Sequence, residues 1–324
     1  MTTKEMLLGL LEANKGTYFS GEQIAQMLHV SRAAVWKAMK ALRQEGYAID
    51  AVTNRGYCLS ENTDILSPQG IRKYLKIAYQ GMELTVLPAA ISTNALLREK
   101  ANQGCPEGCT VISNAQTEGR GRYGRKFYSP GDTGIYMSIL LRPVHYAPQQ
   151  AARLTAAAAV AMCEAIEAVS GETAQIKWVN DIFLRGKKVC GILTEASFGL
   201  ESGALEYAVL GVGVNVYPPR EGFPQELKEI AGTIFDSARD DAKNRLAGEF
   251  INRFMDCYTA PDQTGYIEKY RSRSLVIGKT VTVFSGNRPR GAYAYGIDDA
   301  CHLLVRYDDG ETASLSYGEI GIRM

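Results

Sequence analysis

The spacing of apolar residues changes twice along this chain of 324 residues, and each change restricts the possible fold. Up to about residue 44, apolar side chains recur every three or four positions, which is typical of amphipathic helices. From about residue 83, strand-like runs alternate with helical segments, and from Leu275 only short alternating runs remain. We therefore expect an α+β protein with three domains, at residues 1–62, 63–272 and 273–324.

The composition excludes some classes of protein and leaves others open. The 36 Lys and Arg residues nearly balance the 35 Asp and Glu residues, so binding to nucleic acid must be argued from local patterns. The seven cysteines are scattered and lack the paired CxxC spacing of zinc sites, which indicates a reducing compartment. The longest apolar run, from Leu154 to Cys163, is shorter than the roughly 20 residues that cross a bilayer, and the N-terminus does not resemble a signal peptide. We expect a cytoplasmic protein without a membrane partner.

The first 60 residues carry the signals of three helices followed by a hairpin. Capping signals at the helix starts are Thr2 with Glu5, Ser20 with Gln23, and Ser31. The second helix should stop near His29, and the alternating segment Tyr47–Leu59 turns at Asn54–Gly56. Two short helices joined by a tight turn, with a hairpin behind them, predict a winged helix-turn-helix domain.

The third of these helices has a basic face around one aromatic residue. We expect Arg32 and Trp36, near its start, to reach base edges of DNA, while the other cations contact phosphates. The predicted DNA-binding residues are Arg32, Trp36, Lys37, Lys40, Arg43 and Arg55. The alternative is a surface helix whose charged face is only solvated, because the segment up to Ser60 holds seven basic against five acidic residues.

The central part alternates between strands and helices, which predicts a layered α/β arrangement. Asn62–Pro68 is polar and should form a linker. A long alanine-rich helix starting at Pro148 should pack on the sheet, and a helix over Ala242–Tyr258 should end the domain. The expected strands are Thr85–Ala90, Thr110–Ser113, Gly134–Leu141, Gln175–Trp178, Lys188–Ser197 and Glu206–Asn215, with a further helix at 94–101.

The C-terminal part predicts a small β domain. Ile267–Ser274 should be a polar, basic bridge leading into it. The expected strands are Thr280–Phe284, Gly291–Asp298, His302–Asp308 and Glu311–Tyr317, with turns at Ser285–Asn287 and Asp308–Gly310. Short strands at this spacing are typical of a barrel of hairpins.

The most unusual segment is the loop Gln116–Phe127, which combines three glycines with three arginines and a lysine. The glycines let the backbone wrap closely around a ligand, and the cations offer partners for carboxylate or phosphate groups. We expect a ligand to order this loop. The alternatives are an arginine-glycine loop that touches nucleic acid and a solvated loop without a ligand.

Three weaker signals accompany this loop. Lys177–Asp181 and Arg185–Lys188 lie at a strand end and the next hairpin, where ligand sites of α/β proteins occur. The glycines of Gly211–Asn215 would let a flat ring approach a strand, and Ser92–Asn94 offers polar side chains. Each has a plain structural alternative, namely a solvated turn, a buried strand with a bulge, and the N-cap of a helix.

Taken together, these segments resemble biotin protein ligases in type, order and spacing. The matching segments are Ser92–Asn94, Gln116 with Gly119–Phe127, Lys177–Asp181, Lys187–Glu195 and Gly211–Asn215. With the winged helix ahead and the small β domain behind, nearly the whole chain resembles the bifunctional biotin ligases that also repress the biotin operon. The resemblance implies a catalytic domain of the class II synthetase-like type and an SH3-like C-terminal domain that supports ligand and acceptor binding.

The resemblance also implies roles for individual residues. Ser92, Thr93, Asn94 and Gln116 would hydrogen-bond the biotin head group, and Gly119, Arg120 and Arg122 would belong to the loop that closes over it. Lys188 would contact the biotin carboxylate and the phosphate, and Gly191 would border the biotin pocket. Lys177, Asn180, Asn215 and Phe127 would line the ATP side, and Asp181 would help to hold Mg²⁺. Lys188, Arg122 and Asp181 would be the catalytic residues.

Three positions depart from the usual pattern of this family. Val179 replaces a proline, Phe127 replaces a tryptophan, and Tyr123 stands where an arginine is frequent. None of these departures removes a charged group assigned to the chemistry. Activity is therefore expected, while the affinity for the nucleotide is left open.

The implied activity is that of an ATP-dependent, AMP-forming biotin–protein ligase. It would form biotinyl-5'-AMP, transfer biotin to a lysine of a biotin carboxyl carrier protein, and dimerise with the adenylate on operator DNA as a repressor of biotin synthesis and transport genes. Joining two anions calls for cations and a metal, and the three histidines, at 29, 145 and 302, form no nucleophile motif. One alternative is a repressor that has lost ligation, which the intact set Arg120, Arg122, Asp181 and Lys188 disfavours. Lipoate attachment is disfavoured by the arginine-glycine loop.

Overall fold

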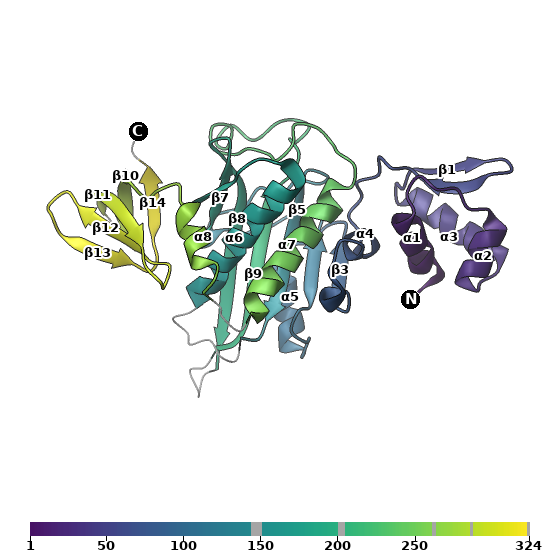
Figure 1. The fold of residues 1–324 in the computed structure, drawn as a ribbon, viewed down its shortest axis with the longest axis horizontal. Helices are drawn as coiled ribbons and strands as arrows, with labels where there is room; N and C mark the ends of the chain where they lie inside the picture. Colours follow the sequence, from purple (N-terminus) through teal and green to yellow (C-terminus); the bar gives the residue numbers. More distant parts are fainter. Residues whose placement is uncertain (144–150, 200–204, 261–263, 286–287, 323–324) are drawn as a thin grey trace. The chain divides into compact units, whose positions relative to one another are not determined.

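A computed structural model describes residues 1–143, 151–199, 205–260, 264–285 and 288–322 of the chain (Figure 1). They form two compact units, of which the larger comprises Met82–Asp236 and Phe250–Met324 and the smaller comprises Met1–Gly81 and Ser237–Glu249. The three-domain boundaries stay a prediction. None of the described helices combines the length and apolar character that a membrane crossing requires.

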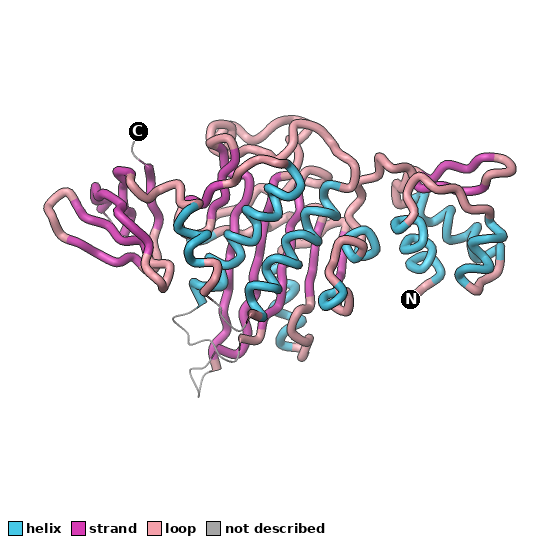
Figure 2. Tube along the Cα trace, in the orientation of Figure 1, coloured by secondary structure: helices cyan, strands magenta, loops and turns pink. Residues whose placement is uncertain are grey.

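A seven-stranded sheet in the larger unit positions the site (Figure 2). Its strand order is β3-β4-β5-β9-β8-β7-β6, in which β3 and β4 are parallel and the other neighbours antiparallel. The strands are β3 (Leu84–Leu87), β4 (Thr110–Ser113), β5 (Gly134–Leu141), β6 (Gln175–Lys177), β7 (Asp181–Leu184), β8 (Lys187–Phe198) and β9 (Leu205–Asn215). All were expected except β7, which fills the sheet between β6 and β8.

Two helices cover much of this sheet. The helix α5 (Thr93–Asn102) packs on β5, and α6 (Ala151–Ser170) packs on β8 (Figure 1). Ala156, Ala158 and Ala159 of α6 are fully buried, which confirms the predicted packing of the alanine-rich helix. Their small side chains allow the backbone of the helix to approach the strands closely. The predicted helix start at Pro148 lies outside the described residues. A single turn, η2 (Arg122–Gly124), interrupts the basic loop.

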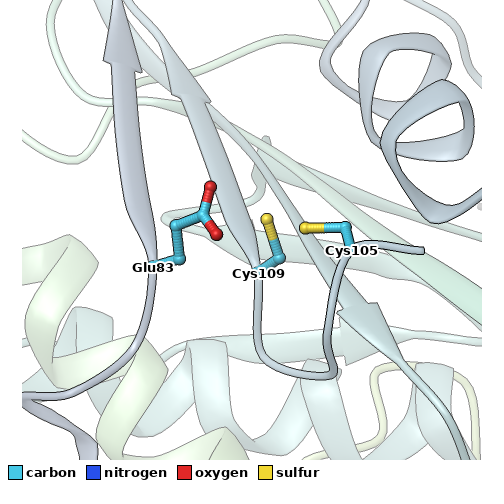
Figure 3. A group of neighbouring side chains, drawn as sticks. All are labelled: Glu83, Cys105 and Cys109. Atoms are coloured by element: carbon cyan, nitrogen blue, oxygen red, sulfur yellow. The ribbon is translucent and has the colours of Figure 1, made fainter. Parts of the chain in front are cut away.

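The parallel pair at one edge of the sheet brings three side chains together (Figure 3). Glu83 and Cys109 directly precede β3 and β4, whose first residues, Leu84 and Thr110, are paired in register. Cys105 lies in the turn between α5 and β4. The carboxylate and the two thiols therefore share one end of the sheet.

The C-terminal part of the larger unit forms one five-stranded antiparallel sheet in the order β13-β12-β11-β10-β14. Its strands are β10 (Lys279–Ser285), β11 (Arg288–Ile297), β12 (Leu303–Tyr307), β13 (Thr312–Leu315) and β14 (Glu319–Ile322). The predicted β domain is confirmed, although β14 was not expected. The predicted turn at Ser285–Asn287 falls largely on Gly286 and Asn287, outside the described residues.

The segment expected to be a polar bridge is instead the helix α8 (Ile267–Ser272). Ile267 and Tyr270 lie one turn apart and are both buried, and the Tyr270 hydroxyl donates to the carbonyl of Val179 at 2.9 Å. Burial of these two side chains explains the helix, because the remaining residues of the segment are polar.

The smaller unit contains the predicted winged helix. Its elements are α1 (Thr3–Ala13), α2 (Gly21–Leu28), α3 (Arg32–Gln44), β1 (Ile49–Val52) and β2 (Gly56–Leu59). Both capping boxes and the Ser31 N-cap are present, and His29 ends α2 in the left-handed region. Leu7, Leu11, Ile24, Leu42 and Leu59 are fully buried in its core.

The wing has a third participant that the sequence did not reveal. Phe19 pairs with Tyr57 as an isolated antiparallel bridge beside β2. Gly56, at the start of β2, has a φ of 97°, and a Cβ at this position would lie 2.1 Å from the carbonyl oxygen of Phe19. The wing turn therefore requires glycine for both conformation and space.

The predicted linker is packed rather than exposed. Thr63, Leu66 and Ser67 are buried, and Ser67 caps a short helix, α4 (Pro68–Arg72), that we did not expect. A 3₁₀ turn, η1 (Ile77–Tyr79), follows it. The helix α7 (Ala242–Thr259), which was predicted, begins in this unit.

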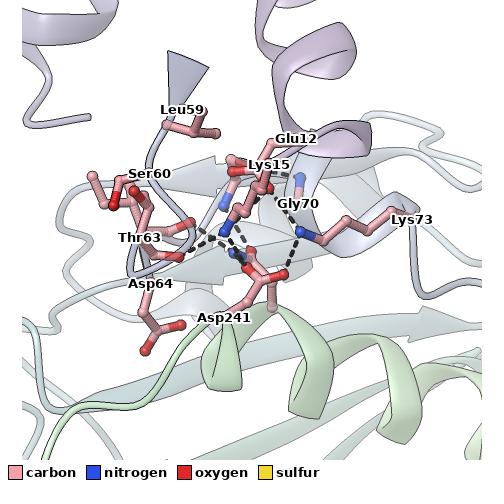
Figure 4. A network of polar contacts seen from close by, with 12 residues as sticks. Glu12, Lys15, Leu59, Ser60, Thr63, Asp64, Gly70, Lys73 and Asp241 are labelled. Atoms are coloured by element: carbon pink, nitrogen blue, oxygen red, sulfur yellow. Dashed lines mark hydrogen bonds and ion pairs between the residues drawn. The ribbon is translucent and has the colours of Figure 1, made fainter. Parts of the chain in front are cut away.

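A network of buried charges joins α1, α4 and the start of α7 (Figure 4). The Lys73 ammonium contacts Asp241 and lies 2.9 Å from the Glu12 carboxylate, and Lys15 lies 3.0 Å from Asp241. Burial alone would raise the pKa of Asp241, but hydrogen bonds from Lys73, Tyr74 and Asn244 outweigh it and lower this pKa below its ordinary value. Burial would likewise lower the pKa of Lys73, yet its bonds to Asp241 and Glu12 raise it.

Candidate active site

A cavity of about 370 Å³ lies in the larger unit, and almost every predicted biotin- or ATP-site residue lines it. These residues come from the start of α5, the loop after β4, and strands β6 to β9. The predicted residues that line the cavity are Ser92, Thr93, Asn94, Gln116, Arg120, Arg122, Phe127, Lys177, Asn180, Asp181, Lys188, Gly191 and Asn215. The structure thus brings together segments more than 100 residues apart.

Gly119 is the one predicted residue of this set that does not line the cavity. It is a buried residue of the loop, and its carbonyl accepts a hydrogen bond from the amide of Phe127 at 2.8 Å. A Cβ at Gly119 would lie 2.5 Å from the carbonyl oxygen of Phe127 and from the hydroxyl of Ser129. This glycine therefore lets the loop fold back on itself.

One end of the cavity presents buried polar side chains that are held in fixed orientations. Ser92 caps α5, and Thr93 donates from its amide and its hydroxyl to the Gln116 side-chain carbonyl at 2.9 and 3.2 Å. Asn94 donates to the Glu195 carboxylate at 2.7 Å and accepts from the Ser138 hydroxyl at 2.6 Å. Because these bonds fix the side chains, this end can recognise a polar head group by geometry.

The glycines of β9 make room for side chains of the protein. A Cβ at Gly211 would lie 2.1 Å from Oδ1 of Asn94, and one at Gly213 would lie 2.5 Å from the ring of Phe127. In the structure, the ring of Phe127 lies against this strand, and the approach of a ligand ring stays a prediction. The alternative was a buried strand with a bulge; the strand is largely buried, but it pairs with β8 in regular register at these glycines, so there is no bulge here.

The basic loop is folded over the cavity by contacts within the larger unit. Gly121 donates to the carbonyl of Arg125 at 2.7 Å, and Arg122 donates to the Asn180 side chain at 3.2 Å. Arg125 forms a two-point ion pair with Glu319 at the start of β14, with one N···O distance of 2.8 Å. Glu319 also lines the cavity, so the C-terminal sheet contributes to the site.

Lys188 and Asp181 form an ion pair at the centre of the cationic part. The Lys188 Nζ lies 2.6 Å from Oδ1 of Asp181, and both side chains are partly exposed to the cavity. The pair arises because β7 and β8 form a hairpin that turns at Arg185 and Gly186, both with positive φ. Arg122 lines the same cavity, so the three residues for which the resemblance implies a catalytic role lie on one cavity.

The charge of the lining is strongly positive. Among the described residues, the positively charged side chains that line the cavity are Arg120, Arg122, Arg125, Lys126, Lys177 and Lys188. The negatively charged ones are Asp181 and Glu319. None of the described histidines lines it, so this part of the chain offers no histidine for a Ser-His or Cys-His pair. The cavity is therefore suited to binding anions.

Sequence reasoning missed part of the wall. Phe223, Leu227, Ile230 and Ala231 come from an irregular segment after β9, and Gly318–Ile320 come from the C-terminal sheet. The ring of Phe223 packs edge-on against Tyr128, with centroids 6.4 Å apart. These residues belong to no motif, and only the folded chain brings them to the cavity.

The predicted DNA-binding residues are partly assembled on α3. Trp36 has 60% of its surface exposed, and the Lys40 Nζ lies 5.6 Å from the centre of its ring. A shallow groove is lined by Trp36, Met39, Lys40, Arg43, Gln44 and Tyr57, which joins the helix to the wing. Lys37 is exposed on α3, outside this groove.

The three arginines of the DNA-binding set have partners within the unit. Arg43 donates from Nε and Nη2 to the carbonyl of Ile49, at 3.1 and 2.8 Å, and thereby supports the wing. Arg32 lies 3.6 Å from Glu22, and Arg55 stacks over Tyr18 at 4.2 Å. Of these three, Arg43 lines the groove.

Comparison with known proteins places these observations in a family. Residues 86–215 match the biotin/lipoate A/B protein ligase family, residues 3–58 match a helix-turn-helix domain, and residues 276–323 match the biotin protein ligase C-terminal domain. The chain is 35% identical over 314 residues to the bifunctional ligase/repressor BirA of Bacillus subtilis strain 168, covering 95% of each protein. The chain belongs to the bifunctional biotin ligase/repressor family.

Other relatives of this family agree with the assignment. The biotin--[acetyl-CoA-carboxylase] ligase of Mycobacterium tuberculosis is 32% identical over 248 residues, which is 74% of this chain and 88% of that protein. The biotin protein ligase of Aquifex aeolicus, solved in complex with biotin and ATP, superimposes with a TM-score of 0.60 at 25% identity and covers 74% of this chain and 98% of that one. The predicted α+β fold, with a helix-turn-helix ahead of a biotin ligase domain, is confirmed.

Proposed function

We propose that this protein forms biotinyl-5'-AMP and pyrophosphate from biotin and ATP, and then transfers the biotinyl group to a lysine of a biotin carboxyl carrier protein. The observation that carries the proposal is the cavity in which Arg122, Lys188 and Asp181 lie together, with fixed polar side chains at its other end. The family relation to a ligase/repressor over 95% of the chain supports the same conclusion.

The reaction follows from the charges. A biotin carboxylate oxygen attacks the α-phosphorus of ATP, the bond to the bridging oxygen breaks, and pyrophosphate leaves with the electron pair. The uncharged amine of the carrier lysine then attacks the carbonyl carbon of this mixed anhydride, AMP leaves, and the amine loses a proton as the amide forms. Both anions must first come close, and Arg122 and Lys188 are positioned to offset their repulsion.

The residues divide between the two substrates. Ser92, Thr93, Asn94 and Gln116 would hold the biotin head group, with Gly191 at the wall of its pocket and Gly119 shaping the loop. Arg120, Arg122 and Lys188 would contact the carboxylate and the phosphate where they meet. Lys177, Asn180, Asn215 and Phe127 would line the nucleotide side, where Asn215 is held by a bond to the Gly232 carbonyl at 3.1 Å.

Asp181 fits the expected Mg²⁺. A carboxylate oxygen is the kind of ligand that Mg²⁺ prefers, and this cation is commonly held by one or two carboxylates together with substrate phosphates. When bound, Mg²⁺ would neutralise phosphate charge in the transition state. The partner of Asp181 in the structure is Lys188, so a carboxylate able to take a cation lies beside the lysine proposed for the phosphate.

We propose further that the winged helix makes the molecule a repressor of biotin synthesis and transport genes. Biotinyl-5'-AMP would act as corepressor by promoting a homodimer that binds operator DNA through the α3 groove. The exposed Trp36 and Lys40 support this role, because a solvent-exposed tryptophan beside a cation is suited to base edges and phosphates. The substrates and the carrier protein are expected in the cytoplasm.

The ligase proposal is tested by transfer of labelled biotin to a purified carrier domain in the presence of ATP and Mg²⁺. Wild-type protein should label the carrier, and Lys188→Ala should lower the rate by roughly 100-fold or more, because it removes a charge-stabilising donor. Lys187→Ala is the matched control, since the Lys187 ammonium donates to the Glu229 carbonyl at 2.6 Å. If wild-type protein bound biotin and ATP but transferred no label, a repressor without ligase activity would replace this proposal.

A further inference from the structure

The turn between α5 and β4 holds two thiols that the proposed ligase reaction does not use. Cys105 and Cys109 are separated by three residues, and this C-x₃-C spacing falls within the range found for zinc ligands. The spacing is one residue longer than that of a CxxC pair. One ligand atom of each cysteine and one carboxylate oxygen of Glu83 all lie within 4.8 Å of one another.

Hydrogen bonds hold the backbone at all three residues. Cys105 donates from its amide to the carbonyl of Lys100 at 3.0 Å, and the Cys109 carbonyl accepts from the amide of Leu140 at 2.9 Å. Glu83 is tied to the neighbouring strand, because its carbonyl accepts from the amide of Thr110 at 2.8 Å. Binding of one ion by the three groups therefore calls for adjustment of the side chains and not of this backbone.

The backbone of the turn brings the two cysteines close to each other. Gly104 and Gly108 flank the two cysteines with φ values of 86° and 83°, a region that side chains rarely adopt. Figure 3 shows that both sulfur atoms and the carboxylate point into the same space between the strand starts. Cys109 is buried, Cys105 is half-buried and Glu83 is exposed, so an ion bound here would have protein on one side and water on the other.

We propose that Glu83, Cys105 and Cys109 bind a thiophilic divalent cation of the zinc class, with water as the fourth ligand. Two thiolates and one carboxylate form a donor set that suits zinc and disfavours magnesium, which prefers oxygen ligands alone. On binding, each thiol releases its proton to solvent and the sulfur takes the metal in its place. The ion would tie the starts of β3 and β4 to the turn that follows α5.

The alternative is that no metal binds here and the thiols are only small core residues. Two observations bear on it. Cys109 packs with Leu97, Val111 and Leu140 in an apolar cluster, as a buried free cysteine often does. Glu83 has another partner, because Lys100 lies 3.4 Å from one of its oxygens. That pair is largely exposed and contributes little, so it does not prevent a metal from taking the carboxylate.

Cadmium binding to the full-length protein tests the site. The reduced, metal-free chain is titrated with Cd²⁺, and the ultraviolet charge-transfer band of cadmium thiolate is recorded together with the bound metal per chain. We expect one Cd²⁺ per chain, displaced by Zn²⁺. Cys105→Ser should remove about half of the band and weaken binding at least about tenfold, because one of two sulfur ligands is lost.

Two further variants separate this site from chance binding at other cysteines. Glu83→Gln should weaken Cd²⁺ binding about tenfold while leaving the saturated band unchanged, since both sulfurs remain. Cys257→Ser removes a cysteine that is likewise not fully buried but lies elsewhere, and it should change neither quantity. Failure of wild-type protein to show the band, or an equal band and affinity in Cys105→Ser, would overturn the proposal. Cys105 is only half-buried, so this variant should fold even if Cys109→Ser does not.

Discussion

At the scale of single residues, the orientation of Asn94 at the start of α5 depends on a glycine of β9, a strand that this helix contacts. Asn94 is held by Ser138 and Glu195, so its side chain cannot move aside. A methyl group at Gly211 would lie 2.1 Å from its Oδ1. Gly211 is therefore needed for the shape of the proposed biotin pocket, although it contributes no polar atom.

We predict that Gly211→Ala weakens biotin binding about tenfold or more. The added methyl group would force the Asn94 side chain out of its present orientation, and a loss of about 1.4 kcal/mol in binding free energy corresponds to a factor of ten in affinity. Isothermal titration calorimetry with biotin measures the effect, and thermal unfolding checks that the variant is folded. Gly265→Ala is the control, because a Cβ there meets nothing within 4 Å. An unchanged affinity in a folded Gly211→Ala variant would remove Asn94 from the biotin site.

The sequence predicts the roles of residues within one short segment better than contacts between residues of distant segments. Segments such as Gln116–Phe127 and Lys177–Asp181 are recognisable because each carries its charges and glycines within a few positions. Ser138 and Glu195 could not be found in this way, since Asn94 reaches them only because α5 packs on the sheet that contains β5 and β8. Glu83 meets Cys109 through the parallel pairing of β3 and β4. Neither helix packing nor strand pairing is encoded in any one segment.

At the scale of elements, the buried charges around Asp241 hold α1, α4 and the start of α7 together. Asp241 has a φ of 54°, a region that asparagine also adopts readily, so Asp241→Asn changes the charge with little change in the backbone. We predict that this substitution lowers the free energy of unfolding of the smaller unit by about 3 kcal/mol at neutral pH. The loss arises because the half-buried ammonium groups of Lys15 and Lys73 lose a buried carboxylate.

This difference should depend on pH. The folded-state pKa of Asp241 is lowered, so its stabilisation is complete above the unfolded-state pKa and is lost as pH falls through the folded value. The gap between wild type and Asp241→Asn should therefore shrink below about pH 4. Hydrogen exchange of the α1 amides in urea measures the difference in the free energy of unfolding between the two proteins. Lys4→Ala, which breaks an exposed pair with Glu45, should cost less than about 1 kcal/mol. Equal losses in the two variants would contradict the network's role.

The elements that sequence reasoning missed are short or weakly patterned. The helix α8 offers only Ile267 and Tyr270 as apolar residues, and β7 and β14 have four residues each. Their positions follow from the neighbours that cover them, so periodicity could not reveal them. The long, strongly periodic elements, such as α3 and α6, were predicted, and so were the capped helix starts.

At the scale of the whole molecule, the two proposed activities reside in two units that the contacts of the chain separate. The cationic cavity lies in the larger unit, and the groove of α3 lies in the smaller one. A change of surface charge on α3 should then alter the affinity for DNA without altering the rate of ligation. Biotin and ATP should affect both, because the proposed adenylate is the product of one activity and the corepressor of the other.

We predict that Lys40→Ala separates the two functions. Loss of one phosphate contact should weaken binding about tenfold and reduce the slope of log affinity against log salt by about one, while carrier labelling stays at the wild-type rate. The probe is a duplex selected from random sequence by wild-type protein with biotin and ATP, in mobility-shift assays over a range of salt. Lys4→Ala removes a charge from α1 that Glu45 already neutralises, so it should leave the slope unchanged. If Lys40→Ala bound this duplex as tightly as wild type at every salt concentration, the α3 groove would not be the DNA-binding surface.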